Sequence, residues 1–241
     1  SAYDFETNTY TIAATEFIKD TIEELLFTSV HEGGHRDLTR MVDKSFFEKE
    51  TKRLLLNVVE DPRVNNWESK RYKGVEKMMK ASYAHYFPKD DREKWSNEKV
   101  LPHEQFGAAL IYEWAYGVPC PSVQDPVVLE VLDKTRDAAK RAYNLIPQTL
   151  FPSEGLKLKL AVESTKIIKE EILPEYEKLV QMSKDIIKQK LKSGKGMGDG
   201  QADGGGRPVP SELLDEESEK ILEGRAKKLA DQFEGKVRQN S

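Results

Sequence analysis

The stretch "FTSVHEGGHRDLTR" (residues 27–40) contains two of the four histidines of this 241-residue chain. His31 and His35 are four residues apart, and Glu32 directly follows the first histidine. On an α-helix, residues i and i+4 lie on one face with Cβ atoms about 5–6 Å apart, so both imidazoles can reach one ion. Glu32 would lie beside that ion, where it can take a proton from a metal-bound water. The stretch therefore predicts an HExxH zinc site on a helix.

Apolar residues at helical spacing lead into this motif, which favours a helix through it. They are Phe17, Ile18, Ile22, Leu25 and Leu26. Gly33 and Gly34 are unfavourable in a helix, because each costs about 1 kcal/mol relative to alanine. Close approach of another element or of substrate would explain them. The alternative is that residues 33–34 form a loop between two helices and that the histidines are unrelated surface residues.

A catalytic zinc ion needs a third protein ligand and keeps its fourth position for water. The segment "LLLNVVEDPRVNNW" (54–67) places Glu60 at the end of an amphipathic helix that we expect over residues 43–61. A helix–turn–helix return would bring Glu60 beside the two histidines. With His31, His35 and Glu60 as ligands, zinc would lower the pKa of the water to about 7.

Two neighbours of Glu60 leave alternatives open. Pro62 disfavours helical geometry at Asp61, which predicts a helix boundary or a kink there. The favoured interpretation of Asp61 is a helix N-cap with Pro62 at the first helical position. Asp61 is otherwise a hydrogen-bonding partner of His31 or His35, or the metal ligand in place of Glu60. Asn57, one turn before Glu60, is either a hydrogen-bonding partner of the site or part of a solvated face.

The pattern resembles that of the gluzincins, zinc metallopeptidases with HExxH on one helix and a glutamate on a later one. Within them, "HEGGH" followed by "NVVEDPRV" is similar to peptidase domains found ahead of von Willebrand factor A modules. The resemblance covers roughly residues 5–70. It implies His31, His35 and Glu60 as zinc ligands and Glu32 as general base. It also implies that a strand near the active helix pairs with an extended substrate, and "TNTYTIAA" (7–14) is the candidate.

The rest of the chain predicts a mainly α fold: a zincin-like helical domain with a short N-terminal β element, followed by a flexible Gly-rich linker and a helical tail. We expect the zincin-like metallopeptidase domain over residues 1–192, the linker over 193–210 and the charged helical tail over 211–241. Further helices are expected at 63–86, 103–116, 127–145 and 154–192, with a bend at Pro174.

Composition narrows the possible partners. The chain has 42 acidic and 38 basic residues and a net charge of −4, which gives no electrostatic footprint for nucleic acid or an anionic membrane. No apolar run approaches the length of about 20 residues that a membrane span needs. Cys120 is the only cysteine, which excludes an internal disulfide and a cysteine-based zinc cluster and favours a cytoplasmic setting.

The sequence thus predicts zinc-dependent hydrolysis of a peptide or protein substrate, with Zn²⁺ as the cofactor. The alternative is a non-catalytic zinc-binding module that acts through its tail on partner domains or proteins. A third hypothesis is a regulated enzyme in which the tail occupies the active-site cleft. His85 and His103 are interpreted as surface or helix-start residues. These two histidines, Arg63 and the tyrosines Tyr72, Tyr83 and Tyr86 are the candidates for stabilising an oxyanion.

Overall fold

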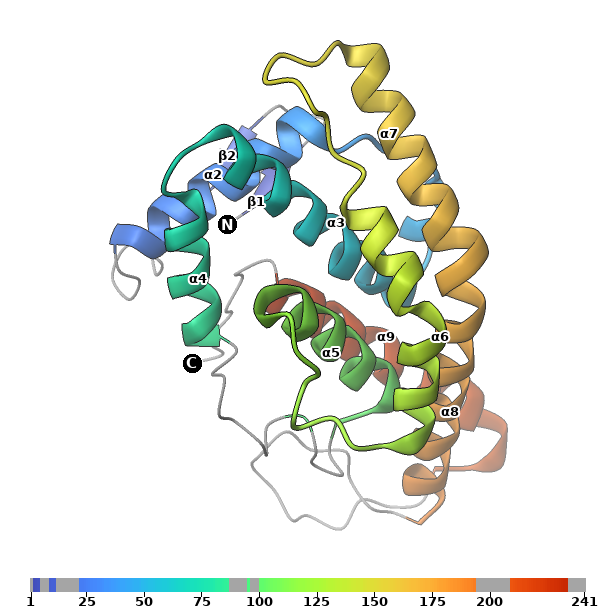
Figure 1. The fold of residues 1–241 in the computed structure, drawn as a ribbon. Coiled ribbons are helices and arrows are strands. Elements are labelled where there is room, and N and C mark those ends of the chain that lie inside the picture. Colours follow the sequence, from blue (N-terminus) through green and yellow to red (C-terminus); the bar gives the residue numbers. More distant parts are fainter. Residues whose placement is uncertain are drawn as a thin grey trace.

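The computed structural model describes residues 2–4, 9–11, 22–86, 95, 100–193 and 209–233, and it is mainly helical (Figure 1). The α-helices are α2 (Ile22–Leu38), α3 (Glu50–Arg71), α4 (Val75–Tyr86), α5 (Pro102–Tyr116), α6 (Pro126–Tyr143), α7 (Glu154–Ile167), α8 (Leu173–Lys192) and α9 (Leu214–Phe233). Short 3₁₀ turns precede α3 (Lys44–Phe47) and α9 (Ser211–Leu213). These helices confirm the predicted mainly α class.

None of the helices in these ranges combines the length and the apolar character that a membrane span requires.

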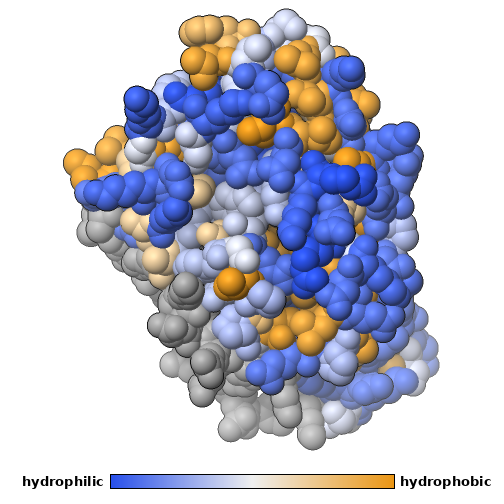
Figure 2. Space-filling view, in the orientation of Figure 1, coloured by the Kyte–Doolittle hydropathy of each residue, from blue (hydrophilic) through white to orange (hydrophobic). Residues whose placement is uncertain are grey.

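Helix α3 is the centre of the fold and packs against α2, α5, α6 and α9. Its buried side chains face in all directions, because α3 has neighbours on several sides. They include Leu54, Leu55, Val58, Val59, Val64 and Trp67, each at most 2% exposed. In Figure 1, α7 and α8 run along one side of the molecule, and α2 and α4 lie on the other. Figure 2 shows mostly hydrophilic side chains on this face, with smaller hydrophobic patches among them.

The helix boundary predicted at Asp61 is wrong, because α3 continues through Pro62 to Arg71. Asp61 is consequently an interior residue of α3 and not an N-cap. Proline removes one backbone hydrogen bond and crowds the preceding turn, which disfavours this arrangement locally. The turns around Pro62 are buried without interruption from Val58 to Asn65. Tertiary packing of α3 therefore outweighs the local preference of proline.

The long helix predicted over residues 154–192 is interrupted where a bend was expected. A π-helical turn, Ile168–Ile172, joins α7 to α8 directly before Pro174. Such turns occur as local bulges within α-helices and accommodate a break in the hydrogen-bond ladder. Ile168 and Ile172 are both fully buried, so the turn directs two large apolar side chains into the core.

At the N-terminus, strands β1 (Ala2–Asp4) and β2 (Thr9–Thr11) pair antiparallel. Tyr3 lies opposite Tyr10 in this register, and β1 contacts α2. The remainder of the strand expected over residues 7–14 lies outside the described residues. The same holds for most of the linker expected over residues 193–210.

The boundary predicted at residue 192 does not separate α9 from the core. Helix α9 packs against α3 and α8, and Ala226, Leu229 and Ala230 are at most 5% exposed within the main core cluster. The carboxylate of Glu223 accepts hydrogen bonds from backbone N–H groups in the first turn of α3. The sequence suggested a solvated tail because α9 has few large apolar side chains. Its leucines are nevertheless buried, since Leu214, Leu222 and Leu229 are at most 5% exposed, and they are joined by Ala226 and Ala230.

His103 is completely buried in the first turn of α5 and is not a surface residue. Ser183 donates its proton to the Leu179 carbonyl, so its hydroxyl oxygen accepts from His103 Nδ1 at 2.9 Å. Burial lowers the pKa of His103 to about 4, with Arg225 adding to the effect and Glu104 opposing it. As the pH falls, the unfolded chain binds a proton on this histidine near pH 6.5, well before the folded chain does.

We therefore expect His103 to lower the free energy of unfolding by about 2 kcal/mol between about pH 7.5 and about pH 5. Urea unfolding of wild type and His103→Gln at the two pH values isolates this contribution from that of other groups. The wild type should lose more stability than the variant over this range. An equal loss in both proteins would contradict the buried neutral state of His103.

Candidate metal centre

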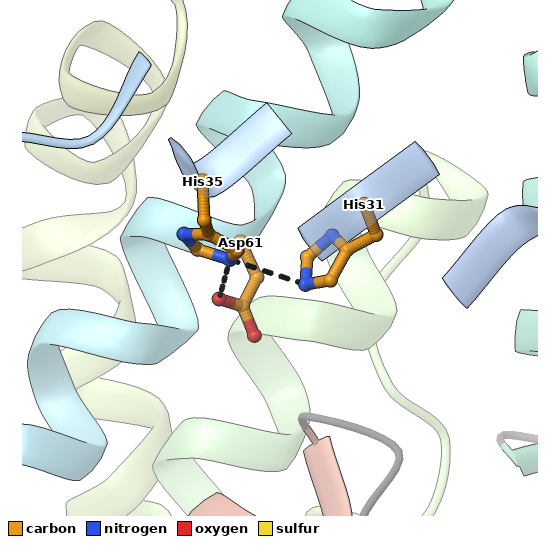
Figure 3. A group of neighbouring side chains, drawn as sticks. All are labelled: His31, His35 and Asp61. Carbon is orange, nitrogen blue, oxygen red and sulfur yellow. Dashed lines mark hydrogen bonds and ion pairs between the residues drawn. The ribbon is translucent and has the colours of Figure 1, made fainter. Parts of the chain in front are cut away.

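Two histidines from α2 and one aspartate from α3 meet where these helices cross (Figure 3). The Nε2 atoms of His31 and His35 are 3.1 Å apart, and Oδ1 of Asp61 lies 3.3 Å from His35 Nε2. One ligand atom from each of the three residues lies within 4.8 Å of the others. Two ligands of a tetrahedral zinc ion, each about 2.1 Å from the metal, are roughly 3.4 Å apart. The observed spacing is therefore close to that of a metal site.

The cluster is largely shielded from solvent. His31 is 6% exposed and Asp61 2%, while the side chain of His35 is 16% exposed. Oδ2 of Asp61 is buried and has no hydrogen-bond partner within the described part of the chain. An unpaired buried carboxylate oxygen is costly, because it has lost its water without a replacement. A bound cation would remove that cost.

The position of the proton on His31 follows from Asn65 and Tyr83. The side-chain N–H group of Asn65 donates to the Tyr83 hydroxyl at 3.2 Å, which turns the amide oxygen toward His31. That oxygen lies 2.8 Å from Nδ1 of His31. Nδ1 therefore carries the proton, and Nε2 of His31 presents a lone pair to the cluster.

The proton on His35 is placed by Thr39. The Thr39 hydroxyl donates its proton to Oε1 of Glu60 at 2.6 Å. Its oxygen lies 2.9 Å from Nδ1 of His35 and can only accept there, so Nδ1 is protonated. Nε2 of a neutral His35 then also presents a lone pair to the cluster.

Three acceptor atoms thus face one another, and only a cation can satisfy all of them. In the absence of a metal, a proton on His35 Nε2 serves this purpose. Burial alone would lower the pKa of His35, but the hydrogen bond and charge of Asp61 outweigh it and raise the pKa to about 9. The charges of Glu32 and Glu60 add to this effect. The same arrangement of lone pairs and a carboxylate suits a divalent metal ion.

Glu60, the predicted third ligand, does not lie in the group of possible ligands. Its oxygens accept hydrogen bonds from Arg63 Nε at 2.7 Å, Arg63 Nη2 at 2.6 Å and the Thr39 hydroxyl. Burial would raise the pKa of Glu60, but Arg63 and Thr39 lower it overall. Successive residues of a helix point about 100° apart, so Glu60 and Asp61 do not face the same ion. The geometry favours Asp61 over Glu60 as the third ligand.

Glu32 is buried at 6% exposure, on the same helix as the two histidines. It lies close enough to His35 for its charge to raise that residue's pKa, yet it is outside the ligand group. Asn57 is half-buried, and the imidazole Nδ1 atoms of His31 and His35 bond to Asn65 and Thr39.

Asn65 and Thr39 were missed from the sequence, although helical spacing relates each to the site. Thr39 follows His35 by four residues, and Asn65 follows Asp61 by four. The second relation is visible only if α3 is allowed to continue through Pro62. A helix boundary at Asp61 removed the geometric reason to consider Asn65.

The residues proposed from the sequence to stabilise an oxyanion lie in different parts of the structure. Burial and the charge of Asp61 raise the pKa of Tyr83, so its hydroxyl keeps its proton beside Asn65. The guanidinium of Arg63 is held by Glu60, and His103 bonds to Ser183 on α8. Tyr72 is exposed and lines a hollow on another face of α2. The side chains of His85 and Tyr86 lie outside the described residues.

The chain matches no known family model, and it has no significant match among curated proteins or solved structures. The gluzincin resemblance thus remains a prediction from the quoted motifs. What points to a metal centre is the geometry of His31, His35 and Asp61 and of the groups that orient them.

A hollow of about 540 Å³ lies next to α2 but does not include the cluster. It is lined by Gly33 and Arg36, which lie on the face of α2 opposite the histidines, and by Arg40 just beyond the end of α2, among others. Many of its charges are already paired: Asp37, for example, accepts from Arg71 at 2.5 Å and from Lys157 at 2.6 Å. This hollow therefore does not provide access to the cluster of His31, His35 and Asp61.

The two glycines of HEGGH have different surroundings. A Cβ atom on Gly34 would lie 2.6 Å from Cγ1 of Val64 and 2.8 Å from Cγ of Glu68, both on α3. A Cβ atom on Gly33 would meet nothing within 4 Å. Gly34 thus allows the close contact between α2 and α3 that brings the histidines to Asp61. The alternative of a loop at residues 33–34 is wrong, because α2 is continuous through both glycines.

This contrast supplies a matched pair of variants. We expect Gly34→Ala to reduce the free energy of unfolding by about 1–3 kcal/mol, because the two helices must separate. Gly33→Ala should increase it by up to about 1 kcal/mol, since alanine favours the helix and nothing opposes it. Urea unfolding of both variants in the presence of a chelator measures the difference. Equal stability of the two variants would contradict the proposed role of Gly34.

Proposed function

We propose that this chain binds one Zn²⁺ ion through Nε2 of His31, Nε2 of His35 and the carboxylate of Asp61, and that it hydrolyses peptide bonds. The observation that carries the proposal is the convergence of three acceptor atoms from the buried His31 and Asp61 and the half-buried His35. Asn65 and Thr39 bond the far side of each imidazole and so direct both Nε2 lone pairs inward. Three protein ligands leave one position for water or substrate, as in catalytic zinc sites.

The chain's own residues then supply the acid–base chemistry. When bound, zinc would polarise the scissile carbonyl and make water more acidic. Glu32 accepts a proton from the water as its oxygen bonds to the carbonyl carbon. The C–N bond then breaks, and Glu32 passes the proton to the leaving amine. Burial of Glu32 on the helix of the two histidines is the support for this role.

The N-terminal strands are the proposed place for the substrate backbone. β1 contacts α2, the helix that carries the histidines, and β2 pairs with β1. A strand edge next to a catalytic helix can add an extended peptide through main-chain hydrogen bonds. The gluzincin resemblance implies the same arrangement.

Glu32 also separates this proposal from its alternatives. A zinc-binding interaction module needs no buried carboxylate beside the metal, and such structural sites are closed by four protein ligands. Within the described part of the chain, the ligand group has three members. Two histidines and a carboxylate also suit non-haem iron(II), but that chemistry gives no role to a neighbouring base. Furthermore, the apolar face of α9 packs into the core of the same chain, which leaves that face no surface for binding a partner protein.

We expect Glu32→Gln to retain about one zinc ion per chain but to lose at least about 100-fold in peptide hydrolysis, because it removes the base and keeps the ligands. Mass spectrometry of a mixed peptide library, incubated with each zinc-loaded protein, measures cleavage. Elemental analysis of the same samples verifies the metal content.

Cleavage by Glu32→Gln at the wild-type rate would contradict the mechanism. A zinc-loaded wild type that cleaves no peptide in the library would favour the non-catalytic zinc-binding module.

A further inference from the structure

We infer that Glu60 is a positioning residue, which acts through Thr39 to hold the imidazole of His35 in place for the metal. This inference rests on the proposed zinc function. It assigns different tasks to two adjacent acids of α3: Asp61 lies in front of His35, on its Nε2 side, and Glu60 lies behind it.

Thr39 connects the two sides through its position at the end of α2. Its backbone N–H donates to the His35 carbonyl at 2.9 Å and completes the last turn of the helix. Its side chain accepts from His35 Nδ1 at 2.9 Å and donates to Glu60 at 2.6 Å. A hydroxyl has one proton, so the direction of both hydrogen bonds is fixed once Glu60 is a carboxylate.

Glu60 is itself held rigidly. Arg63 bonds both of its oxygens, and the guanidinium is completely buried. The same guanidinium donates to the Leu145 carbonyl at 3.3 Å, and so links Glu60 to the segment that follows α6. Thr39, Glu60 and Arg63 also border a small cavity of about 90 Å³ with mainly apolar walls. Hydrogen bonds in such surroundings are stronger than in water.

The consequence is that the two histidines are supported differently. His31 is backed by the neutral amide of Asn65, whereas His35 is backed by a hydroxyl that bonds a carboxylate. A carboxylate behind an imidazole fixes its orientation and makes its other nitrogen a better ligand. Loss of such support typically weakens metal binding by 10–100-fold.

The hydrogen-bond chain from Glu60 through Thr39 to His35 is best tested by replacing Thr39. Replacing Glu60 would leave the buried Arg63 without its counter-ion, and the variant would lose its fold for reasons unrelated to zinc. Thr39→Val keeps the size of the side chain but cannot accept from His35. Thr39→Ser restores the hydroxyl and is the matched control.

We expect zinc affinity, measured by competition with a chromophoric chelator, to fall about 10-fold in Thr39→Val and to change less than about 3-fold in Thr39→Ser. The visible spectrum of the Co²⁺-loaded proteins should change in Thr39→Val alone, because the imidazole is no longer fixed. The imidazole ¹⁵N–¹H NMR signal of His35 Nδ1–H should be protected from exchange in wild type and Thr39→Ser and lost in Thr39→Val.

Wild-type affinity and an unchanged cobalt spectrum in Thr39→Val would overturn the positioning role while leaving the zinc site intact. Equal losses in Thr39→Val and Thr39→Ser would also overturn it, because the hydroxyl would then not be the cause. A wild type that binds neither zinc nor cobalt would overturn the inference together with the proposed function.

Discussion

The contact between α2 and α3 at Gly34 is the constraint on which the candidate site depends. Val64 and Glu68 occupy the space that any larger side chain at this position would need. Because the helices touch here, His31 and His35 reach Asp61 across the helix crossing, and their Nδ1 atoms reach groups that hold them. Without this contact, the three ligand atoms would not fall within 4.8 Å of one another. One missing Cβ atom therefore has consequences for both packing and chemistry.

The remaining helices keep α3 continuous, so that Asp61 and Asn65, four residues apart, lie on the same side. Pro62 lies between these two residues and would favour a break in an isolated helix. Burial on several sides, including the face covered by α9, keeps the helix continuous. Glu223 of α9 accepts hydrogen bonds from the first turn of α3, so the segment expected to be a tail helps to hold the helix that carries Asp61.

The sequence predicted the helix of the HExxH motif, and it placed the candidate third ligand in the segment that the structure brings to the histidines, because both follow from local spacing. It did not predict which of two adjacent acids faces the histidines. That choice depends on the direction in which each side chain leaves the continuous helix α3. The boundary expected at Pro62 ended the helix there and so gave no basis for assigning these directions. Likewise, α9 buries only three leucines together with Ala226 and Ala230, and so short an apolar stripe in a charged segment does not reveal that the helix belongs to the core. Contacts between helices far apart in the sequence therefore determined both the acid that faces the histidines and the position of α9.

The central claim is that Asp61 completes a zinc site with His31 and His35. Its most direct test is the zinc content of wild type, Asp61→Asn and the control Asp37→Asn, by elemental analysis after zinc loading and dialysis. Asparagine keeps the size of the side chain and removes its charge. We expect about one zinc per chain in wild type and Asp37→Asn and almost none in Asp61→Asn. Full zinc retention by Asp61→Asn, or no zinc in the wild type, would contradict this claim.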